Sequence, residues 1–179
     1  PMKLNIQFLQ RTLQGGNVEE VRQRFKDISS ILVEQIDHMA SIASAFSDFA
    51  KMPVANSEWF NLSELVQGCT TLFENNVDRM ICDIEPDILV YGDKDQVNRV
   101  IVNLLKNATQ SIPEGREGLI TVTLTHEEQG GVLAVRDNGA GIPEGIRNHI
   151  SEPNFTTKSG GMGLGLAMSY KIIESMGGT

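Results

Sequence analysis

The sequence has few cysteines, few aromatic residues and no long apolar segment. Its 179 residues include two cysteines, Cys69 and Cys82, whose spacing suits no metal site, so we expect reduced structural thiols in a cytosolic domain. No apolar run reaches the about 18 residues of a membrane-spanning helix, and no secretory signal opens the chain. We therefore expect a cytoplasmic domain of a parent protein that only segments outside this chain would attach to a membrane.

Positive charge is also scarce. The sequence has 15 Lys and Arg against 23 Asp and Glu, a net charge of −8. General nucleic-acid binding requires a basic face, so we expect no nucleic-acid partner. A bound polyphosphate would have to be neutralised locally, by a cation or by backbone amides. The length allows one domain or two small ones.

Residues 1–52 have the pattern of a helix, a turn and a second helix. Asn17 is the expected N-cap of the second helix, and Glu20 completes a capping box. That helix carries a heptad seam with one polar member: Val18, Val21, Phe25, Ile28, Leu32, Gln35, Met39, Ile42, Phe46 and Phe49. One hairpin cannot cover so wide a seam, so we expect two chains to form a four-helix bundle. The alternative is that the hairpin packs on the second half of its own chain.

Residues 53–57 have the composition of a short linker, and residues 58–179 mix strands with helices. Asn61 and Asp93 are the expected N-caps of the first two helices in this part. We expect strands at 58–60, 79–84 and 88–91, helices at 62–74, 94–111 and 164–176, and a hairpin that turns at 127–131. Because the strands and helices do not follow a strict βαβ order, the pattern indicates an α+β fold, a mixed sheet with helices on one face.

The expected helix at 94–111 carries two asparagines on one side. Asn103 and Asn107 are four residues apart and share a face, about 100–140° from the centre of the apolar stripe. Asparagine is a mediocre helix former, whereas its carboxamide oxygen can coordinate Mg²⁺, which keeps most of its waters and takes other ligands from phosphates. The pair indicates a site for a hard cation or a polar ligand. Taken alone, a solvated polar face is the simpler interpretation.

Two glycine-containing segments follow. DNGAGIP (137–143) comes after an apolar strand; its glycines allow the backbone to approach a flat ligand, and Asp137 can accept a hydrogen bond from an exocyclic amine such as that of adenine. A plain loop is the alternative. GGMGLGLAMS (160–169) opens a helix, where backbone amides and the helix dipole favour an anion. It matches neither a P-loop nor a dinucleotide-binding fingerprint.

The segment EPNFTTKSG (152–160) lies between them and has the composition of a mobile lid. Phe155 is placed to fix such a lid by packing underneath it. Lys158 and Arg147 are the nearest cations for a phosphate, although each taken singly is more often a solvated surface charge.

Together these segments resemble, in order and spacing, the four sequence boxes of sensor histidine kinases. VNLLKNA (102–108) resembles the N box, DNGAGIP the G1 box, EPNFTTK (152–158) the F box and GGMGLGL (160–166) the G2 box. Within that family the chain is most similar to the nitrogen-regulation type. The resemblance implies that residues 58–179 form a Bergerat-type α/β sandwich, the ATP-binding domain of the GHKL superfamily, without its terminal hairpin.

The resemblance also implies roles in binding Mg²⁺ and ATP. Asn107 is implied as the Mg²⁺ ligand, with Asn103 beside it contacting phosphate or metal, and Asp137 as the carboxylate that reads adenine. Lys158 is implied to contact a phosphate when the lid closes. The other implied ATP-binding residues are Gly139, Gly141, Gly161, Gly163, Leu164 and Gly165.

For residues 1–52 the resemblance implies a truncated dimerisation and histidine-phosphotransfer hairpin, through which the chain forms a homodimer. The phosphate-accepting histidine is expected a few residues before Pro1, so we expect this chain to bind Mg-ATP without phosphorylating itself. In the intact parent, an ATP-dependent protein-histidine kinase, the γ-phosphoryl group would pass to that histidine and then to an aspartate in the receiver domain of a response regulator.

The sequence departs from the family pattern at two positions, and it leaves two other functions open. Ser151 and Asn154 stand where the F box commonly has aromatic residues, which implies a looser lid. An ATPase or conformational clamp of the Hsp90-like kind is one alternative, against which the long helical hairpin argues. The other is a dimerisation or docking module with a degenerate ATP site, which the intact Asn107 and Asp137 oppose.

Overall fold

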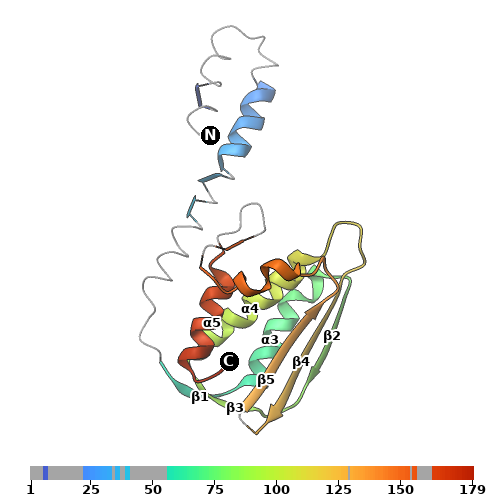
Figure 1. The fold of residues 1–179 in the computed structure, drawn as a ribbon. Helices are drawn as coiled ribbons and strands as arrows, with labels where there is room; N and C mark the ends of the chain where they lie inside the picture. Colours follow the sequence, from blue (N-terminus) through green and yellow to red (C-terminus); the bar gives the residue numbers. More distant parts are fainter. Residues whose placement is uncertain are drawn as a thin grey trace. The chain divides into compact units, whose positions relative to one another are not determined.

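The computed structural model describes residues 6–7, 22–33, 35–36, 39–40, 56–128, 130–153, 155–156 and 163–179 (Figure 1). Contacts within the chain divide it into two compact units, Pro1–Lys51 and Met52–Thr179. Of the predicted linker at 53–57, residues 53–55 lie outside the described ranges.

The described part of the first unit is mainly one helix, over residues 22–33. Ile28 is buried, whereas Phe25, Ile31 and Val33 are 53%, 44% and 57% exposed. Apolar side chains of the predicted seam and its flank therefore reach the surface of this chain. Most of the first predicted helix and the turn after it lie outside the described residues, so the hairpin stays a prediction.

The second unit begins with a two-stranded antiparallel sheet that leads into a helix. β1 (Glu58–Asn61) pairs with β3 (Leu89–Gly92), and α3 (Leu62–Phe73) follows β1 directly. The Asn61 side chain accepts a hydrogen bond from the Glu64 backbone N–H at 3.2 Å, so the predicted N-cap is confirmed. A 3₁₀ turn, η1 (Glu74–Asn76), ends this segment.

A second sheet has three strands in the order β2-β4-β5. β2 (Arg79–Ile84) is parallel to β4 (Leu119–Glu127), which is antiparallel to β5 (Gly130–Asp137). Ile120, Val122 and Leu124 are fully buried, while the residues between them are less buried. Since successive side chains of a strand point to opposite faces, one face of this sheet lines the core and the other faces solvent.

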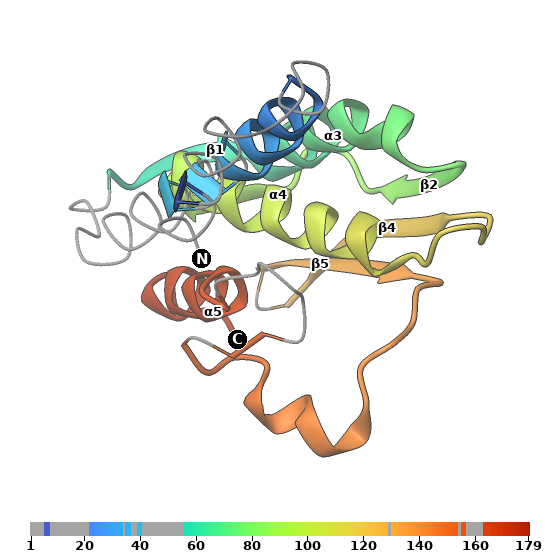
Figure 2. The same ribbon diagram turned by 90° about the horizontal axis from the view of Figure 1, so that it is seen from above.

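Two helices cover the core face of this sheet. α3 and α4 (Lys94–Ser111) lie side by side over β2, β4 and β5, as Figures 1 and 2 show. Side chains of α3, α4 and β4 form one buried apolar cluster, which contains Val66, Ile101 and Leu105 among others. A mixed sheet with helices on one face confirms the predicted α+β class.

The N-cap of α4 is also as predicted. Asp93 Oδ1 accepts from the Gln96 backbone N–H at 3.0 Å, and Asp93 Oδ2 accepts from the Asn56 N–H at 2.9 Å. The hydrogen bond from Gln96, followed by that from Asn56, has the largest effect in holding the pKa of the Asp93 carboxyl below its ordinary value. The start of α4 is therefore fixed by a charged cap.

The last helix, α5 (Gly165–Ser175), packs against α4 (Figure 1) and buries Ala167 and Ile172. A 3₁₀ helix, η2 (Glu144–His149), lies between β5 and α5, where the sequence pattern had indicated no regular element. Pro143 precedes it with φ −55°, and its carbonyl accepts from the Ile146 N–H at 3.1 Å. The fixed φ of proline is compatible with the start of a helical turn at this point.

Both cysteines are free thiols, as predicted. The Cys69 thiol lies in the core 3.0 Å from Asn98 Oδ1, and burial raises its pKa. Cys82 is exposed on β2, so packing explains Cys69 but not Cys82. Among helices in the described ranges, none has the length and apolar content that a bilayer crossing requires.

Candidate functional site

One face of α4 connects the segments singled out in the sequence. Asn103, Asn107 and Ser111 are half-buried and follow one another at intervals of four residues, about one helical turn each. They therefore form a row along the helix. The two ends of this row contact different segments, the loop that follows β5 and the start of α5, which are far apart in the sequence.

At one end, Ser111 contacts the loop that follows β5. Ser111 Oγ lies 2.6 Å from Asp137 Oδ1, and the Ser111 carbonyl accepts from the Ala140 N–H at 3.0 Å. Asp137 Oδ1 also accepts from the Gly139 N–H at 2.9 Å. Both hydrogen bonds that Asp137 accepts from the described residues go to Oδ1, so its second carboxylate oxygen can accept a hydrogen bond from a ligand.

At the other end, Asn103 contacts the start of α5. Its Nδ2 donates to Ser169 Oγ at 3.0 Å, and Asn103 Oδ1 occupies the space that a Cβ on Gly165 would take. The absence of a side chain at Gly165 therefore leaves room for the Asn103 carboxamide at this point. Asn107 lies one turn from Asn103 and one turn from Ser111, between these two sets of contacts.

The backbone around the row has the conformations expected of a ligand cradle. Gly141 and Gly163 have φ of +74° and +63°, which glycine adopts without strain. No atom of the described chain lies within 4 Å of the place that a Cβ on Gly141 would take. Leu164, the buried N-cap of α5, has an apolar side chain that cannot bond the first amides of the helix, which suits an anion.

These features provide the parts that a magnesium-bound nucleotide needs. Asp137 can pair with an amine, and the open side of Gly141 can admit a flat ring. A single carboxamide such as Asn107 is a sparse ligand set, which suits Mg²⁺ because that cation keeps several waters and is otherwise held by phosphates. The described residues thus fit Mg-ATP.

Of the ten predicted site residues, eight lie in the described ranges and border this row or its two loops: Asn103, Asn107, Asp137, Gly139, Gly141, Gly163, Leu164 and Gly165. Lys158 and Gly161 lie outside the described residues, so their predicted contacts remain predictions, as does a role for Asn154.

The two other candidates of the lid have partners of their own. Arg147, which lies in η2 ahead of the lid, donates from Nε to the Ile142 carbonyl at 3.4 Å. Phe155 is half-buried, and its ring centroid lies 6.0 Å from that of His149. His149 Nδ1 in turn lies 2.8 Å from Glu152 Oε1.

Two residues near the site were not among the predicted ones. Ser111 continues the Asn103–Asn107 row by one more turn, so helical spacing could have identified it. Arg116 Nη1 donates to the carbonyls of Asn138 and Gly139 at 2.6 and 2.7 Å. No local sequence pattern identifies Arg116 as a site residue, because its partners are 22 and 23 residues away in the sequence.

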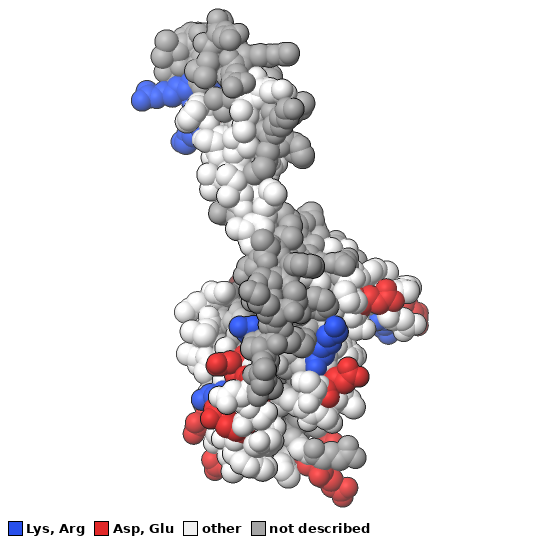
Figure 3. All heavy atoms as spheres, turned by 90° about the vertical axis from the view of Figure 1, so that its left-hand side faces the viewer, with Lys and Arg blue, Asp and Glu red and all other residues white. Residues whose placement is uncertain are grey.

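Charge around the second unit is mixed. On the face shown in Figure 3, acidic and basic side chains are interspersed over this unit. A polyphosphate would therefore depend on local groups rather than on a uniform positive field, as the net charge of −8 also implies.

A separate groove of about 290 Å³ lies between α3 and the start of α4, where it is lined by Glu64, Leu65, Gly68, Cys69, Leu72, Lys94 and Asn98. Asn98 and Asn107 are about two and a half turns apart, so they lie on opposite sides of α4. This groove is distinct from the row of Asn103, Asn107 and Ser111.

Comparison with known proteins gives a family match and several relatives. The family model for histidine kinase-, DNA gyrase B-, and HSP90-like ATPases matches residues 92–179. Nitrogen regulation protein NtrY of Azorhizobium caulinodans is 31% identical over 185 residues, which are 99% of this chain and 24% of that protein. The chain spans between 24% and 36% of the length of the first curated relatives it matches.

Solved structures show the same fold. The catalytic domain of histidine kinase ThkA is 33% identical, with a TM-score of 0.61 over 68% of this chain and 82% of that one. Histidine kinase ThkA in complex with response regulator protein TrrA aligns over 99% of this chain and 52% of that chain, with a TM-score of 0.67 and 24% identity.

Proposed function

Since the chain belongs to the sensor histidine kinases, within the family of histidine kinase-, DNA gyrase B- and HSP90-like ATPases, we propose that residues 58–179 bind Mg-ATP. The intact parent uses it to phosphorylate a histidine. The observation that carries this proposal is the row on α4, which joins an amine-reading carboxylate at one end to a glycine-rich helix start at the other.

Each part of the row has a stated role in this proposal. Asp137 accepts from the exocyclic amine of adenine, and Gly141 lets the backbone approach the ring. Asn107 coordinates Mg²⁺, and Asn103 contacts phosphate or metal beside it. Gly163, Leu164 and Gly165 form the turn whose amides face the phosphates. Lys158 and Gly161 complete the phosphate site.

The reaction of the parent is transfer of the γ-phosphoryl group, in which the bond to the ADP oxygen breaks and a bond to an imidazole nitrogen forms. Bound Mg-ATP supplies the phosphoryl group and the cation that neutralises its charge. The residues of this chain orient the nucleotide and exclude water, which is most of what phosphoryl transfer requires of a protein. We place the accepting histidine outside residues 1–179, so this chain alone does not become phosphorylated.

Calorimetric titration of the chain with ATP in the presence of Mg²⁺ tests the proposal. We expect saturable binding that EDTA weakens, and an affinity reduced by about tenfold or more in Asn107→Ala, because removal of a metal ligand or its support typically costs that much. If the wild-type chain gives no binding heat and no thermal shift with Mg-ATP, the proposal is contradicted and a docking module is favoured. Steady ATP hydrolysis by the parent without a phosphoprotein would favour the Hsp90-like clamp.

We also propose that the chain forms a homodimer through its first unit. Phe25 and Met39, both in the predicted seam, are 53% and 60% exposed. Gln35 is the one polar member of the predicted seam, and a polar seam residue can set the register between two copies, as in coiled coils. Light scattering should give the mass of two chains for the wild type and of one for Met39→Glu; a wild-type mass of one chain would contradict this.

A response regulator is the proposed partner of the parent. Histidine kinase ThkA has been solved in complex with a response regulator protein, and the same fold in this chain supports a receiver domain as the acceptor of the phosphoryl group. A phosphorylated parent that fails to pass the group to any co-encoded receiver domain would contradict this assignment.

A further inference from the structure

The loop after β5 is bonded from two sides at four successive residues. On the α4 side, Ser111 contacts Asp137 through Oγ and Ala140 through its carbonyl. On the other side, Arg116 donates to the carbonyls of Asn138 and Gly139. We call residues 137–141 the base loop, because Asp137 and Gly141 are the residues proposed to meet adenine.

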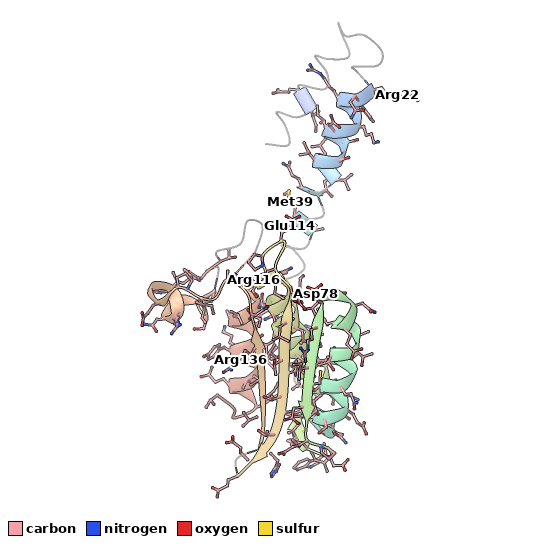
Figure 4. All side chains as sticks on the ribbon, turned by 90° about the vertical axis from the view of Figure 1, so that its right-hand side faces the viewer. Arg22, Met39, Asp78, Glu114, Arg116 and Arg136 are labelled. Atoms are coloured by element: carbon pink, nitrogen blue, oxygen red, sulfur yellow. The ribbon has the colours of Figure 1, made fainter. Side chains whose placement is uncertain are left out.

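The Asn138 side chain ties the same loop to the start of β4. Its Oδ1 accepts from the Leu119 N–H and its Nδ2 donates to the Glu117 carbonyl, both at 2.9 Å. The segment that carries Arg116 is itself anchored, since the Gly118 N–H donates to Asp78 Oδ2 at 2.6 Å. Figure 4 shows Arg116 and Asp78 at the same end of the sheet. Arg116 therefore extends from a fixed support.

The bonds of Arg116 differ from those of an ordinary surface arginine. Glu114 and Glu117 are close to it in the sequence, yet its Nη1 donates to two consecutive backbone carbonyls. Carbonyl dipoles that point at one place repel each other, and a guanidinium between them removes the repulsion with charge-assisted hydrogen bonds. The carbonyls of Asn138 and Gly139 accept from Arg116 on one side of the loop. The amides of Gly139 and Ala140 donate to Asp137 and Ser111 instead.

The base loop needs such support because glycine gives it little stiffness. A Cβ on Gly139 would meet Ser111 Oγ and lie 2.6 Å from the Ser111 carbonyl oxygen, so only glycine fits there. Gly141 has a positive φ. Two glycines in five residues leave the free loop many conformations, and external hydrogen bonds reduce that number.

Ser111 controls which atoms Asp137 offers. Its one hydroxyl hydrogen has two acceptors within reach, the Ala108 carbonyl at 2.7 Å and Asp137 Oδ1 at 2.6 Å, and the ionised carboxylate is the stronger acceptor. Donation to Oδ1 leaves Oδ2 to accept from a ligand amine. Adenine carries an amine at the position where guanine carries a carbonyl, and a carboxylate cannot hydrogen-bond to a carbonyl.

We propose that Arg116 and Ser111 are positioning residues that hold the base loop in the conformation that distinguishes adenine from guanine. Arg116 fixes the carbonyls of the loop and Ser111 fixes the carboxylate of Asp137. This inference rests on the proposed binding of Mg-ATP by the same site.

The test measures the affinity of the whole chain for Mg-ATP and Mg-GTP, together with its melting temperature. The wild type should prefer ATP. Arg116→Ala should bind ATP about tenfold more weakly, because hydrogen bonds from a charged group are the strong ones, and its ATP-to-GTP preference should fall. Arg116→Lys should recover part of both, since one nitrogen makes both contacts. Ser111→Ala should lower the ATP-to-GTP preference while it changes the melting temperature little.

Arg136→Ala is the matched control. It removes the same charge from an exposed arginine beside the loop, at a position that alternates with Asp137 and so lies on the other face of the sheet. Its ATP affinity and base preference should equal those of the wild type.

The outcomes separate the two proposals. A wild-type chain that binds neither nucleotide would overturn the proposed function itself. A wild type that prefers ATP, with Arg116→Ala and Ser111→Ala folded and as selective as Arg136→Ala, would overturn the positioning roles and leave the function standing. A fall in affinity for ATP and GTP by one common factor would also count against them, because it shows loss of structure rather than loss of base recognition.

Discussion

The two ends of the row on α4 are built in different ways. At the Ser111 end, hydrogen bonds of polar side chains fix the base loop: Ser111 bonds to Asp137, Arg116 donates to the Asn138 carbonyl, and the Asn138 side chain bonds to the start of β4. At the Asn103 end, the missing side chain of Gly165 makes room, and the side-chain bond is that of Asn103 to Ser169. The first end is held by hydrogen bonds and the second by close packing, so the two should respond differently to mutation.

Gly139→Ala should have the largest effect. The added Cβ would meet Ser111 Oγ and lie 2.6 Å from a backbone oxygen of Ser111, which cannot rotate away. We expect a loss of about 1–3 kcal/mol in the free energy of unfolding, as for other overpacked sites, and an ATP affinity at least about tenfold lower. Chemical denaturation and calorimetry measure the two. An unchanged midpoint would show that the base loop is not held against α4.

Gly165→Ala should have a smaller effect on stability. Its Cβ would meet the end of the Asn103 side chain, which can rotate, and alanine is the better helix former at the first residue of α5. We expect a stability change below about 1 kcal/mol but a several-fold weaker ATP affinity, because Asn103 would be displaced. If this variant were the less stable of the two glycine variants, the proposed contrast between the two ends would be wrong.

Asp93→Ala alters the N-terminus of α4, which lies ahead of the row and away from the proposed nucleotide site. Loss of the N-cap should cost about 1 kcal/mol with no change in ATP affinity. Because backbone hydrogen bonds hold the pKa of Asp93 below its ordinary value of 3.8, its ionised form stabilises the fold above that pH. This contribution should disappear as the pH falls through the lower pKa of the folded state. Unfolding curves of the two proteins should therefore converge in acid; a constant difference would contradict this.

Gly68→Ala should give the smallest change, and of opposite sign. Gly68 is exposed within α3, and a Cβ there would have no atom of the described chain within 4 Å. Alanine should stabilise the helix by about 0.5–1 kcal/mol and leave ATP affinity unchanged. A loss of stability would contradict the open space that the structure shows around Gly68 in the groove between α3 and α4.

The sequence predicted the features that depend on near neighbours. Asn61 and Asp93 were recognisable as caps because their partners are three residues ahead. The strands of the sheet follow from alternation, as at Ile120, Val122 and Leu124. The asparagine row follows from helical spacing, and the order of the four boxes indicated the family.

The missed features depend on distant partners. Ser111 meets Asp137 across 26 residues, and Arg116 meets the base loop across 22 and 23. A serine at the end of a helix and an arginine in a connection have many uses, and only the fold selects one of them. The turn η2 was missed for a related reason: Pro143 permits either a loop or a helical start, and the residues after it carry no strong periodicity.

Backbone NMR of the isotope-labelled chain during titration with Mg-ATP tests the central claim most directly. We predict that the largest amide shifts occur along the row and its two loops, at Asn103, Asn107, Ser111, Gly139 and Gly163, with little change at Lys94 and Asn98. Shifts concentrated in the groove between α3 and α4, or at one end of the row alone, would contradict a single nucleotide site on that face of α4.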